Sequence, residues 1–282
     1  MRLAVISDIH GNLAALEAAL ADIESLGVDL VVVAGDLVNG APDSRACWEL
    51  IRSRGYSMLR GNHERYLFDL GTPAEAAEWQ GERFGAVRWA AARFSRAELD
   101  EMRDLPDCPR PADCHDLLIV HASPRRDNDN LRPYTPEDEI RAMFAGTSEA
   151  LVIRGHNHIG NTLQLSGRTN GNARTVERTI VTCGSVGMPL DGNASAQYLL
   201  LERHGRSWRW EHRSARYDVD ATLRRFHEDG YLEAAGPIGR LLMREIATAS
   251  HQMVPFLSSW ERWSDGGELD LAAAVDSFLN AY

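Results

Sequence analysis

Five short segments of the chain combine carboxylate, amide and imidazole side chains, the groups that bind divalent metal ions in proteins. They are Asp8-Ile9-His10-Gly11-Asn12, Gly35-Asp36, Gly61-Asn62-His63-Glu64, His121 and Gly155-His156-Asn157-His158. Imidazole ligands favour Mn, Fe, Zn, Ni or Co over Ca. Two such ions held side by side are a recurring device for splitting phosphate esters. The pattern therefore indicates metal-dependent phosphoester chemistry.

The motifs contain enough donors for two metal ions. Asp8 and His10 lie two residues apart and would share one side of an extended strand. Asp36 follows Gly35, which permits a sharp turn, and the two oxygens of its carboxylate can bridge two cations. Each ion has four ligands if Asp36 serves twice, which leaves room for a bridging water. The seven predicted ligands are Asp8, His10, Asp36, Asn62, His121, His156 and His158.

Taken singly, each motif has an ordinary structural explanation. An Asp-x-His pair is often a cap or a surface feature, and Gly-Asp is common at turns. A histidine at a strand end, such as His121, is often only hydrogen-bonded. Five of the ten histidines nevertheless fall within these segments. Their joint occurrence, in order and at predicted strand ends, favours the metal interpretation.

Short apolar segments precede the motifs and predict the strands that position them. These segments are residues 3–6, 30–34, 57–59, 117–120 and 151–153. Apolar residues at helical spacing follow Asn12, a favourable N-cap residue, and predict a helix after the first strand. From about residue 160 the pattern changes to short alternating segments, which are typical of antiparallel strands. This order of elements predicts an α/β fold with two packed sheets and helices outside them.

The composition argues against several classes of protein. A chain of 282 residues with 44% hydrophobic content can bury a sizeable core. Its net charge of −11 argues against extended nucleic acid binding and against a polybasic membrane surface. No apolar stretch reaches the roughly 18 residues that would span a bilayer, and the first strand carries predicted ligands, so we expect a cytoplasmic protein. The chain has no lysine, so any substrate-binding cation must be a guanidinium.

As a set, these motifs resemble those of the calcineurin-like metallophosphoesterases, and more closely their small bacterial and archaeal phosphodiesterase branch. The resemblance also includes His121-Ala122-Ser123-Pro124 and Gly184-Ser185-Val186-Gly187, and it spans residues 1–190. It implies a four-layer α/β/β/α sandwich of two mixed sheets, with a dinuclear metal centre at the sheet edges. It also implies that His63 stabilises the phosphoryl oxygens or protonates the leaving group. One metal would be held by Asp8, His10, Asp36 and His158, and the other by Asp36, Asn62, His121 and His156.

The chain departs from this branch at several places. Residue 122 is alanine where glycine is usual, and Asn157 stands where threonine is usual. The segment Gly187-Met188-Pro189-Leu190 lacks the glutamine and arginine often found there. If this segment approaches the substrate, an apolar contact replaces a phosphate contact. The substrate therefore cannot be carried over from other members of the family.

Three further residues are candidates for substrate binding. Arg125 and Arg126 follow the His121 motif and could meet a second phosphate or a nucleotide; the alternative is a solvated loop. Asn157 lies between two predicted ligands. We expect these residues within a metallophosphoesterase domain at residues 1–231. A helical C-terminal extension at residues 232–282 would pack on this domain or on a partner subunit of a homo-oligomer.

The favoured function is a dinuclear phosphodiesterase that uses two divalent transition metal ions and a metal-bridging hydroxide to cleave small phosphodiesters or nucleotides. A phosphomonoesterase or a dinucleoside polyphosphate hydrolase is the alternative. A nuclease is less favoured because the chain is acidic. A non-catalytic protein-binding module is also less favoured, because His63 and all seven predicted ligands are present. The expected partner is a small phosphorylated substrate, with neither extended nucleic acid nor membrane binding.

Overall fold

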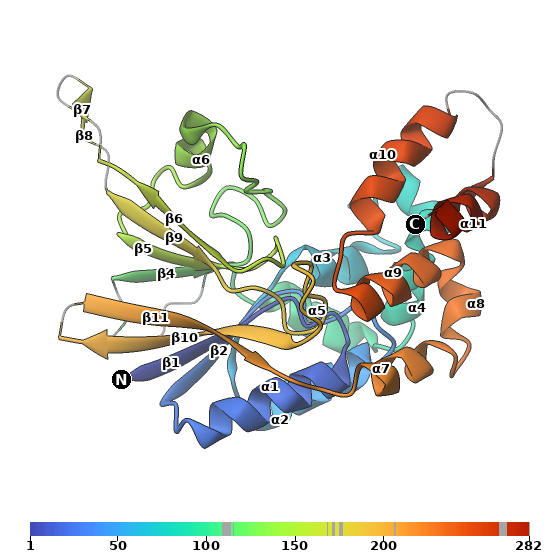
Figure 1. Ribbon diagram of the computed structural model, residues 1–282, viewed down its shortest axis with the longest axis horizontal. Coiled ribbons are helices and arrows are strands. Elements are labelled where there is room, and N and C mark those ends of the chain that lie inside the picture. The colour runs from blue at the N-terminus through green and yellow to red at the C-terminus, as the bar shows by residue number, and fades with distance from the viewer. Residues whose placement is uncertain are drawn as a thin grey trace.

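Two mixed β-sheets lie face to face in the computed structural model (Figure 1). The structure describes residues 1–108, 114, 116–167, 169–170, 173–174, 177–205, 207–264 and 270–281. The first sheet contains β1 (Arg2–Ile6), β2 (Leu30–Ala34), β3 (Ser57–Leu59), β10 (Ala196–His204) and β11 (Ser207–Ala215). Their spatial order is β11-β10-β1-β2-β3, and the strands β1, β2 and β3 are parallel.

The second sheet contains β4 (Leu117–Val120), β5 (Leu151–Arg154), β6 (Asn161–Leu165) and β9 (Arg178–Thr182), in the order β4-β5-β9-β6. The strands β4, β5 and β9 are parallel. A separate short ribbon consists of β7 (Thr169–Asn170) and β8 (Ala173–Arg174). All five strands predicted before the motifs are present. Their carboxyl ends lie at one edge of the sandwich (Figure 1).

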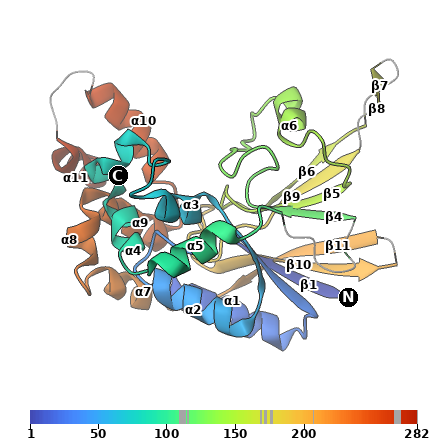
Figure 2. The same cartoon turned by 180° about the vertical axis from the view of Figure 1, so that it is seen from behind.

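The strands are apolar on both faces because both faces are covered. Ile6 of β1 packs toward the outer helices, whereas the preceding residue, Val5, packs between the sheets. The helices α1 (Leu13–Ser25) and α2 (Ser44–Arg54) cover the first sheet. On the opposite side, α6 (Glu137–Met143) covers the second sheet (Figure 2). The predicted four-layer α/β/β/α sandwich is confirmed.

Asn12 begins α1, as its position in the sequence predicts. Its Oδ1 accepts a hydrogen bond from the backbone N–H of Ala15 at 3.2 Å. Its Nδ2 donates to the carbonyl of Gly187 at 2.8 Å. One side chain therefore caps the helix and also binds the loop that follows β9.

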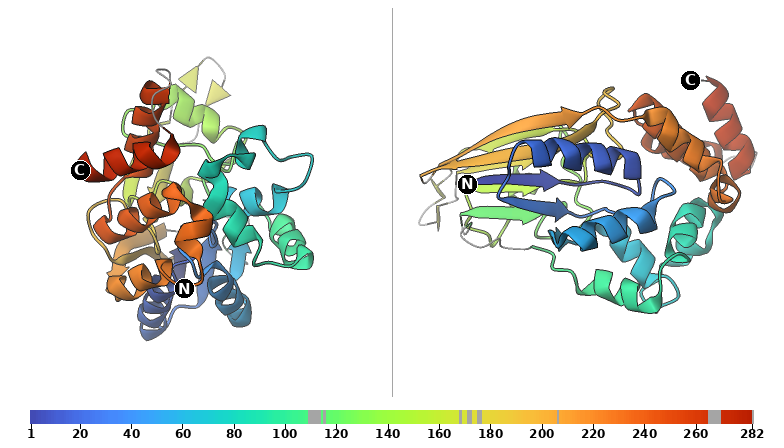
Figure 3. Two further views of the ribbon diagram at one scale, coloured as in Figure 1. Left: turned by 90° about the vertical axis from the view of Figure 1, so that its right-hand side faces the viewer. Right: turned by 90° about the horizontal axis from the view of Figure 1, so that it is seen from below.

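The other helices gather at the carboxyl edge of the sheets, beside the motifs (Figure 3). Residues 73–104 contribute part of this group. No helix within the described residues combines the length and apolar character needed to cross a lipid bilayer. The helices of this group are α3 (Asn62–Asp69), the 3₁₀ helices η1 (Ala77–Gln80) and η2 (Glu82–Phe84), α4 (Gly85–Ala91), α5 (Arg96–Asp104), α7 (Val219–Phe226), α8 (Tyr231–Ala235), α9 (Pro237–Thr248), α10 (Met253–Ser264) and α11 (Leu271–Ala281).

The C-terminal helices pack on the body of the same chain. Tyr231 of α8 lies against Trp89 of α4, with ring centroids 4.7 Å apart, and Ile246 of α9 joins the same apolar core. Residues of α9, α10 and α11 form a second cluster around Phe256. Within the described residues 232–264 and 270–281 the extension is mainly helical, as predicted. A domain boundary at residue 231 stays a prediction, because one apolar core continues across it.

We expect Phe256→Ala to lower the free energy of unfolding by about 3–5 kcal/mol, because this ring is fully buried against Phe278. Chemical denaturation measures the loss. Val254→Ala is the matched control on the same helix, since Val254 is 49% exposed and should change stability by about 0.5 kcal/mol or less. Equal effects of the two variants would contradict this packing.

Candidate metal centre

The predicted ligands converge at the carboxyl edge of the two sheets. Asp8 and His10 follow β1, Asp36 follows β2, and Asn62 begins α3 after β3. The second sheet supplies the remaining imidazoles from the loops after β4 and β5, namely His121, His156 and His158. Residues 148 positions apart in the chain come within hydrogen-bond distance here.

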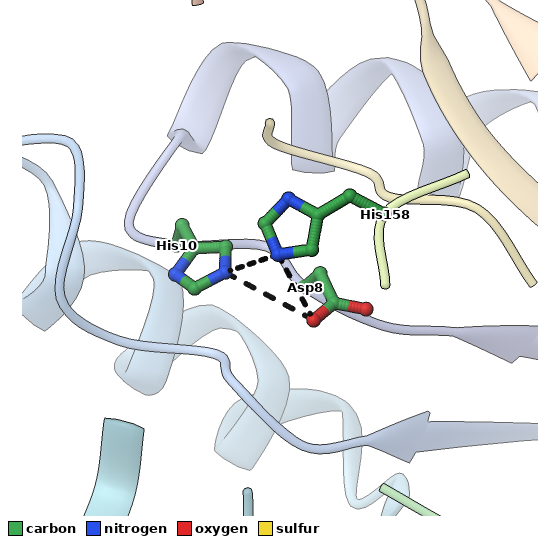
Figure 4. Close-up of side chains that lie close together, drawn as sticks. All are labelled: Asp8, His10 and His158. Atoms are coloured by element: carbon green, nitrogen blue, oxygen red, sulfur yellow. Dashed lines mark hydrogen bonds and ion pairs between the residues drawn. The ribbon is translucent and has the colours of Figure 1, made fainter. Parts of the chain in front are cut away.

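One group of ligand atoms comprises Asp8, His10 and His158 (Figure 4). Nε2 of His158 lies 3.4 Å from Oδ1 of Asp8 and 3.1 Å from Nε2 of His10. Nε2 of His10 lies 3.9 Å from the same Asp8 oxygen. Two ligands that are each about 2.1 Å from one ion lie about 3–3.5 Å apart in a tetrahedral site, so this spacing suits a common metal ion.

A second group comprises Asp36, His121 and His156, with Asn62 beside it. Nε2 of His121 lies 3.2 Å from Oδ2 of Asp36 and 3.1 Å from Oδ1 of Asn62. The same Asp36 oxygen lies 3.8 Å from Nε2 of His10 in the first group. Asp36 therefore faces both groups with one oxygen, as a bridging ligand would.

Backbone carbonyls orient three of the four predicted imidazole ligands. Each of these rings makes its hydrogen bond through Nδ1, which leaves Nε2 directed at the centre, an arrangement typical of metal-binding histidines. The pairs are His10 with the carbonyl of Asn39 (2.7 Å), His121 with that of Ala34 (2.8 Å) and His158 with that of Met188 (2.6 Å).

His156 provides a direct test of whether the site fits a metal ion. Its Nε2 is buried and has no hydrogen-bond partner among the described residues. A buried nitrogen without a partner is costly, and coordination to a metal ion would satisfy it. Two carboxylates, four imidazoles and one amide are also a donor set that suits divalent transition metals. The residues therefore fit the group.

The electrostatics keep four of the seven donors in their ligating forms. Burial, together with neighbouring imidazoles, lowers the pKa of His10 and of His156 to about 3, so both rings are neutral. Burial alone would raise the pKa of Asp8 and Asp36, but the charges of His158 and His121 respectively lower it below the ordinary value. Two buried carboxylates thus stay ionised at neutral pH. They require positive charge beside them, which metal ions would supply. Burial would lower the pKa of His121 and His158, but the charges of Asp36 and Asp8 outweigh it: the pKa of His121 is raised to about 9 and that of His158 is also raised, so metal binding would displace a proton from each ring.

Backbone strain is concentrated at the predicted ligands. Five of them have positive φ angles, in the left-handed region that costs a non-glycine residue roughly 1–2 kcal/mol: Asp8 (54°), His10 (49°), Asp36 (52°), His156 (69°) and His158 (59°). The motif glycines permit close approach of the loops. A Cβ at Gly155 would lie 1.9 Å from Oγ of Ser7, and one at Gly61 would lie 2.2 Å from Oδ1 of Asp36.

Glu64 holds the loops of two motifs together, a role that the sequence analysis missed. Its buried carboxylate accepts hydrogen bonds from the backbone N–H groups of Asp36 (2.9 Å), Leu37 (2.7 Å) and Gly61 (2.7 Å). Burial and the charge of Asp36 raise the pKa of Glu64 to about 7, although these hydrogen bonds oppose the shift. The sequence does contain one indication of this role: Glu64 stands three residues after Gly61 at the start of a helix, where the glutamate of a capping box occurs.

Asn39 was also missed, and it orients His63. The Asn39 Nδ2 donates to Nδ1 of His63 at 2.8 Å, so the neutral ring carries its proton on Nε2. That Nε2 lies 3.9 Å from Oδ2 of Asp36, toward the centre. The Asn39 backbone has a φ of 62°, a conformation that asparagine tolerates better than most residues.

Arg154 is fully buried beneath the last motif and positions its loop. The guanidinium donates to the carbonyls of Ala122 (2.6 Å) and Asp129 (2.9 Å) and to Oδ1 of Asn157. The acceptors are neutral oxygens, so Arg154 connects the loops after β4 and β5 without pairing directly with a carboxylate.

The predicted substrate residues line two different cavities. Asn157 lines a cavity of about 440 Å³ in front of the metal centre, together with His63. Arg125 and Arg126 line another cavity, also of about 440 Å³, on the other side of His121. Arg125 pairs there with Asp129 through two contacts of 2.8 Å. A substrate-binding role of these three residues stays a prediction.

Comparison with known proteins agrees with this geometry. The family model of the calcineurin-like phosphoesterases matches residues 1–160. The chain belongs to this family. The calcineurin-like phosphoesterase fold extends further along it: the crystal structure of a metallophosphoesterase from Sphaerobacter thermophilus is 26% identical, covers 88% of this chain and 100% of its own, and superposes with a TM-score of 0.66.

Two archaeal proteins are also similar to this calcineurin-like phosphoesterase. An uncharacterized protein of Methanocaldococcus jannaschii is 28% identical over 210 residues, which are 71% of this chain and 82% of that protein. A hypothetical protein of Pyrococcus horikoshii, known from its crystal structure, is 17% identical, with 89% of this chain and 99% of that one covered and a TM-score of 0.67. The latter likeness concerns the fold alone.

We expect Glu64→Gln to lower the free energy of unfolding by about 1–3 kcal/mol and to weaken metal binding, because an amide group would face backbone N–H donors that now share a carboxylate. Chemical denaturation and calorimetric titration with Mn²⁺ measure the two effects. Glu78→Gln, at an exposed position of η1, is the control and should alter neither. The assigned role is wrong if both variants behave alike.

Proposed function

We propose that this phosphoester hydrolase is a dinuclear metal-dependent phosphodiesterase acting on small phosphodiesters. The observation that carries the proposal is the position of Asp36, whose Oδ2 lies 3.2 Å from Nε2 of His121 and 3.8 Å from Nε2 of His10. In this arrangement one metal would be held by Asp8, His10, Asp36 and His158. The other would be held by Asp36, Asn62, His121 and His156.

A bound pair of divalent ions would lower the pKa of a water molecule between them and stabilise negative charge on the phosphoryl oxygens. None of the ligand side chains is placed as a free nucleophile. The attacking group in this proposal is therefore the water molecule between the ions. Asp36 is held through its second oxygen, which accepts the backbone N–H of His63 at 2.8 Å. This hydrogen bond keeps Oδ2 aligned with both groups.

His63 supplies a hydrogen bond to the reacting phosphoryl group in this proposal. Burial lowers its pKa, so the ring is neutral, and Asn39 holds the tautomer with the proton on Nε2. Nε2 faces the centre, where it can donate to a phosphoryl oxygen or to the departing alkoxide. Tyr66 lies against the other side of the ring, at a centroid distance of 5.4 Å. The imidazole is therefore fixed in position before substrate binds.

The extent of the cavity favours a phosphodiester over a phosphomonoester as the substrate. It extends from the metal ligands to the helices α9 and α10, so it offers space for a second ester group beyond the phosphorus. Asn157 lines it beside His156 and His158, and its Nδ2 is proposed as a further donor to the substrate. Its Oδ1 already accepts from the backbone of Leu131 and from Arg154.

We expect His63→Ala to lower kcat for bis(4-nitrophenyl) phosphate by about 10²–10³-fold in the presence of Mn²⁺, because a positioned hydrogen-bond donor to the phosphoryl oxygen is lost. Metal content, measured by elemental analysis, should not change. His227→Ala, at an exposed position, serves as the control. Absence of turnover by the native, metal-loaded chain would refute the proposal, and faster turnover of 4-nitrophenyl phosphate would reassign the enzyme as a phosphomonoesterase.

We expect Asn39→Ala to lower kcat by about 10- to 100-fold, because the His63 ring loses the bond that holds its tautomer. KM and metal content should stay near the native values, since the ring of His10 binds the backbone carbonyl of residue 39, which the substitution retains. Steady-state kinetics separates the two parameters. A change confined to KM would show that Asn39 acts on substrate binding instead.

A further inference from the structure

The cavity in front of the metal centre has a polar base and mostly apolar walls. The base is lined by His10, His63, His156 and His158, the imidazoles of the proposed site. The walls come from three separate parts of the chain, and Arg83, Glu245 and His251 are charged or titratable residues among them. The apolar wall residues are Phe84, Ala86 and Val87 of η2 and α4, Met188 and Leu190 of the loop after β9, and Ile238, Leu242, Met253, Val254 and Leu257 of α9 and α10.

The loop after β9 approaches the site, which is the condition under which the sequence analysis expected an apolar contact there. The backbone carbonyl of Met188 accepts the Nδ1 hydrogen bond of His158, and Met188 and Leu190 both line the cavity. Apolar side chains of this loop therefore lie beside a proposed metal ligand.

Few large apolar side chains among the described residues are exposed to solvent, and one of them lines the cavity. Among the described residues, the exposed large hydrophobic side chains are Met1, Tyr134 and Val254. Val254 is 49% exposed and lies on the cavity wall. Val254 thus adds exposed apolar surface to the wall that the neighbouring leucines form.

The distribution of cations argues against a second phosphate in this cavity. Arg83 is the one arginine among the described residues that line it, whereas the cavity behind His121 is lined by four. Because the chain has no lysine, a substrate with several phosphates would find little positive charge here beyond the metal ions. The cavity thus matches one phosphoryl group at its base and a mainly apolar surface above it.

The apolar wall of α10 is held in place by a buried carboxylate. Glu245 of α9 accepts hydrogen bonds from the backbone N–H groups of Gln252 (2.8 Å) and Met253 (2.9 Å), which begin α10. The helix therefore leaves α9 in a defined direction, with Leu257 one turn further along the cavity. A volume of about 440 Å³ lies within the range of small-molecule sites.

We infer that the ester cleaved at this centre carries an apolar alkyl or aryl group, which binds between the metal ligands and the helices α9 and α10. This inference rests on the proposed function for the position of the phosphoryl group. It assigns substrate selection to the C-terminal helices and chemistry to the sheet edges. Leu242 and Leu257 then determine specificity through the apolar surface they present.

A series of 4-nitrophenyl alkyl phosphates, from methyl to hexyl, tests the inference on the full-length, Mn²⁺-loaded chain. Each methylene that enters the cavity should raise kcat/KM by about two- to fourfold, so the hexyl ester should exceed the methyl ester by about 30-fold or more. The binding of methyl- to hexylphosphonate, measured by calorimetry, should show the same dependence of Kd on chain length. A ratio near one in both measurements would overturn the inference.

Variants locate the effect within the cavity. Leu242→Asn and Leu257→Asn should each lower the hexyl-to-methyl ratio by about tenfold, because a polar amide replaces apolar surface. Leu279→Asn is the matched control, since Leu279 is a half-buried leucine of α11 that does not line this cavity. Equal ratios in all three variants would also overturn the inference.

The binding measurements with alkylphosphonates distinguish failure of this inference from failure of the proposed function. If the native chain cleaves no ester but binds hexylphosphonate more tightly than methylphosphonate, the proposed function fails and the apolar specificity stands. If it cleaves bis(4-nitrophenyl) phosphate but neither measurement depends on chain length, the phosphodiesterase stands and the apolar specificity fails.

Discussion

Asp36 places one buried carboxylate between two groups of imidazoles, and the site is arranged around it. One of its oxygens faces His10 and His121, and the other accepts the backbone N–H of His63. A buried charge of this kind is tolerated only where opposite charge or hydrogen bonds compensate it. The surrounding loops supply part of that compensation through a backbone N–H group, and bound metal ions would supply the rest.

The loops that meet at Asp36 are strained and are held from outside the centre. Positive φ angles at five predicted ligands would be unfavourable in a free loop. The carboxylate of Glu64, the guanidinium of Arg154 and the amide of Asn39 bind the backbone or side chains of these loops, and all three are buried. The conformation that brings the donors together thus depends on groups that are not themselves predicted metal ligands.

The C-terminal helices connect the general chemistry of the sheet edges to a particular kind of substrate. In this calcineurin-like phosphoesterase the sandwich positions the donors at the ends of parallel strands. The helices α9 and α10 form one side of the cavity above them. Because α9 shares an apolar core with α4 and α8, and α10 packs on α9, the position of both helices is coupled to the stability of the body.

Much of this structure could be predicted from local patterns. The apolar segments that became β1 to β5 each lie in consecutive residues, the Asn12 cap acts on a residue three positions away, and the donors follow their strands directly. Parallel strands bring their carboxyl ends to a common edge, so the strands and the donor set together predicted the convergence. Composition and spacing alone sufficed for these conclusions.

Long-range packing decided the rest. The sequence by itself determined the two sheets, the donor set and the helical character of residues 232–264 and 270–281, because each depends on neighbouring residues. Only the tertiary structure decided that Arg125 lies behind His121 and pairs with Asp129, whereas Asn157 lines the cavity in front of the metal centre. It also decided that Asn39 holds His63 and that α9 and α10 cover the site. These contacts join elements far apart in the chain, and their geometry follows from how whole layers pack, which no local pattern encodes.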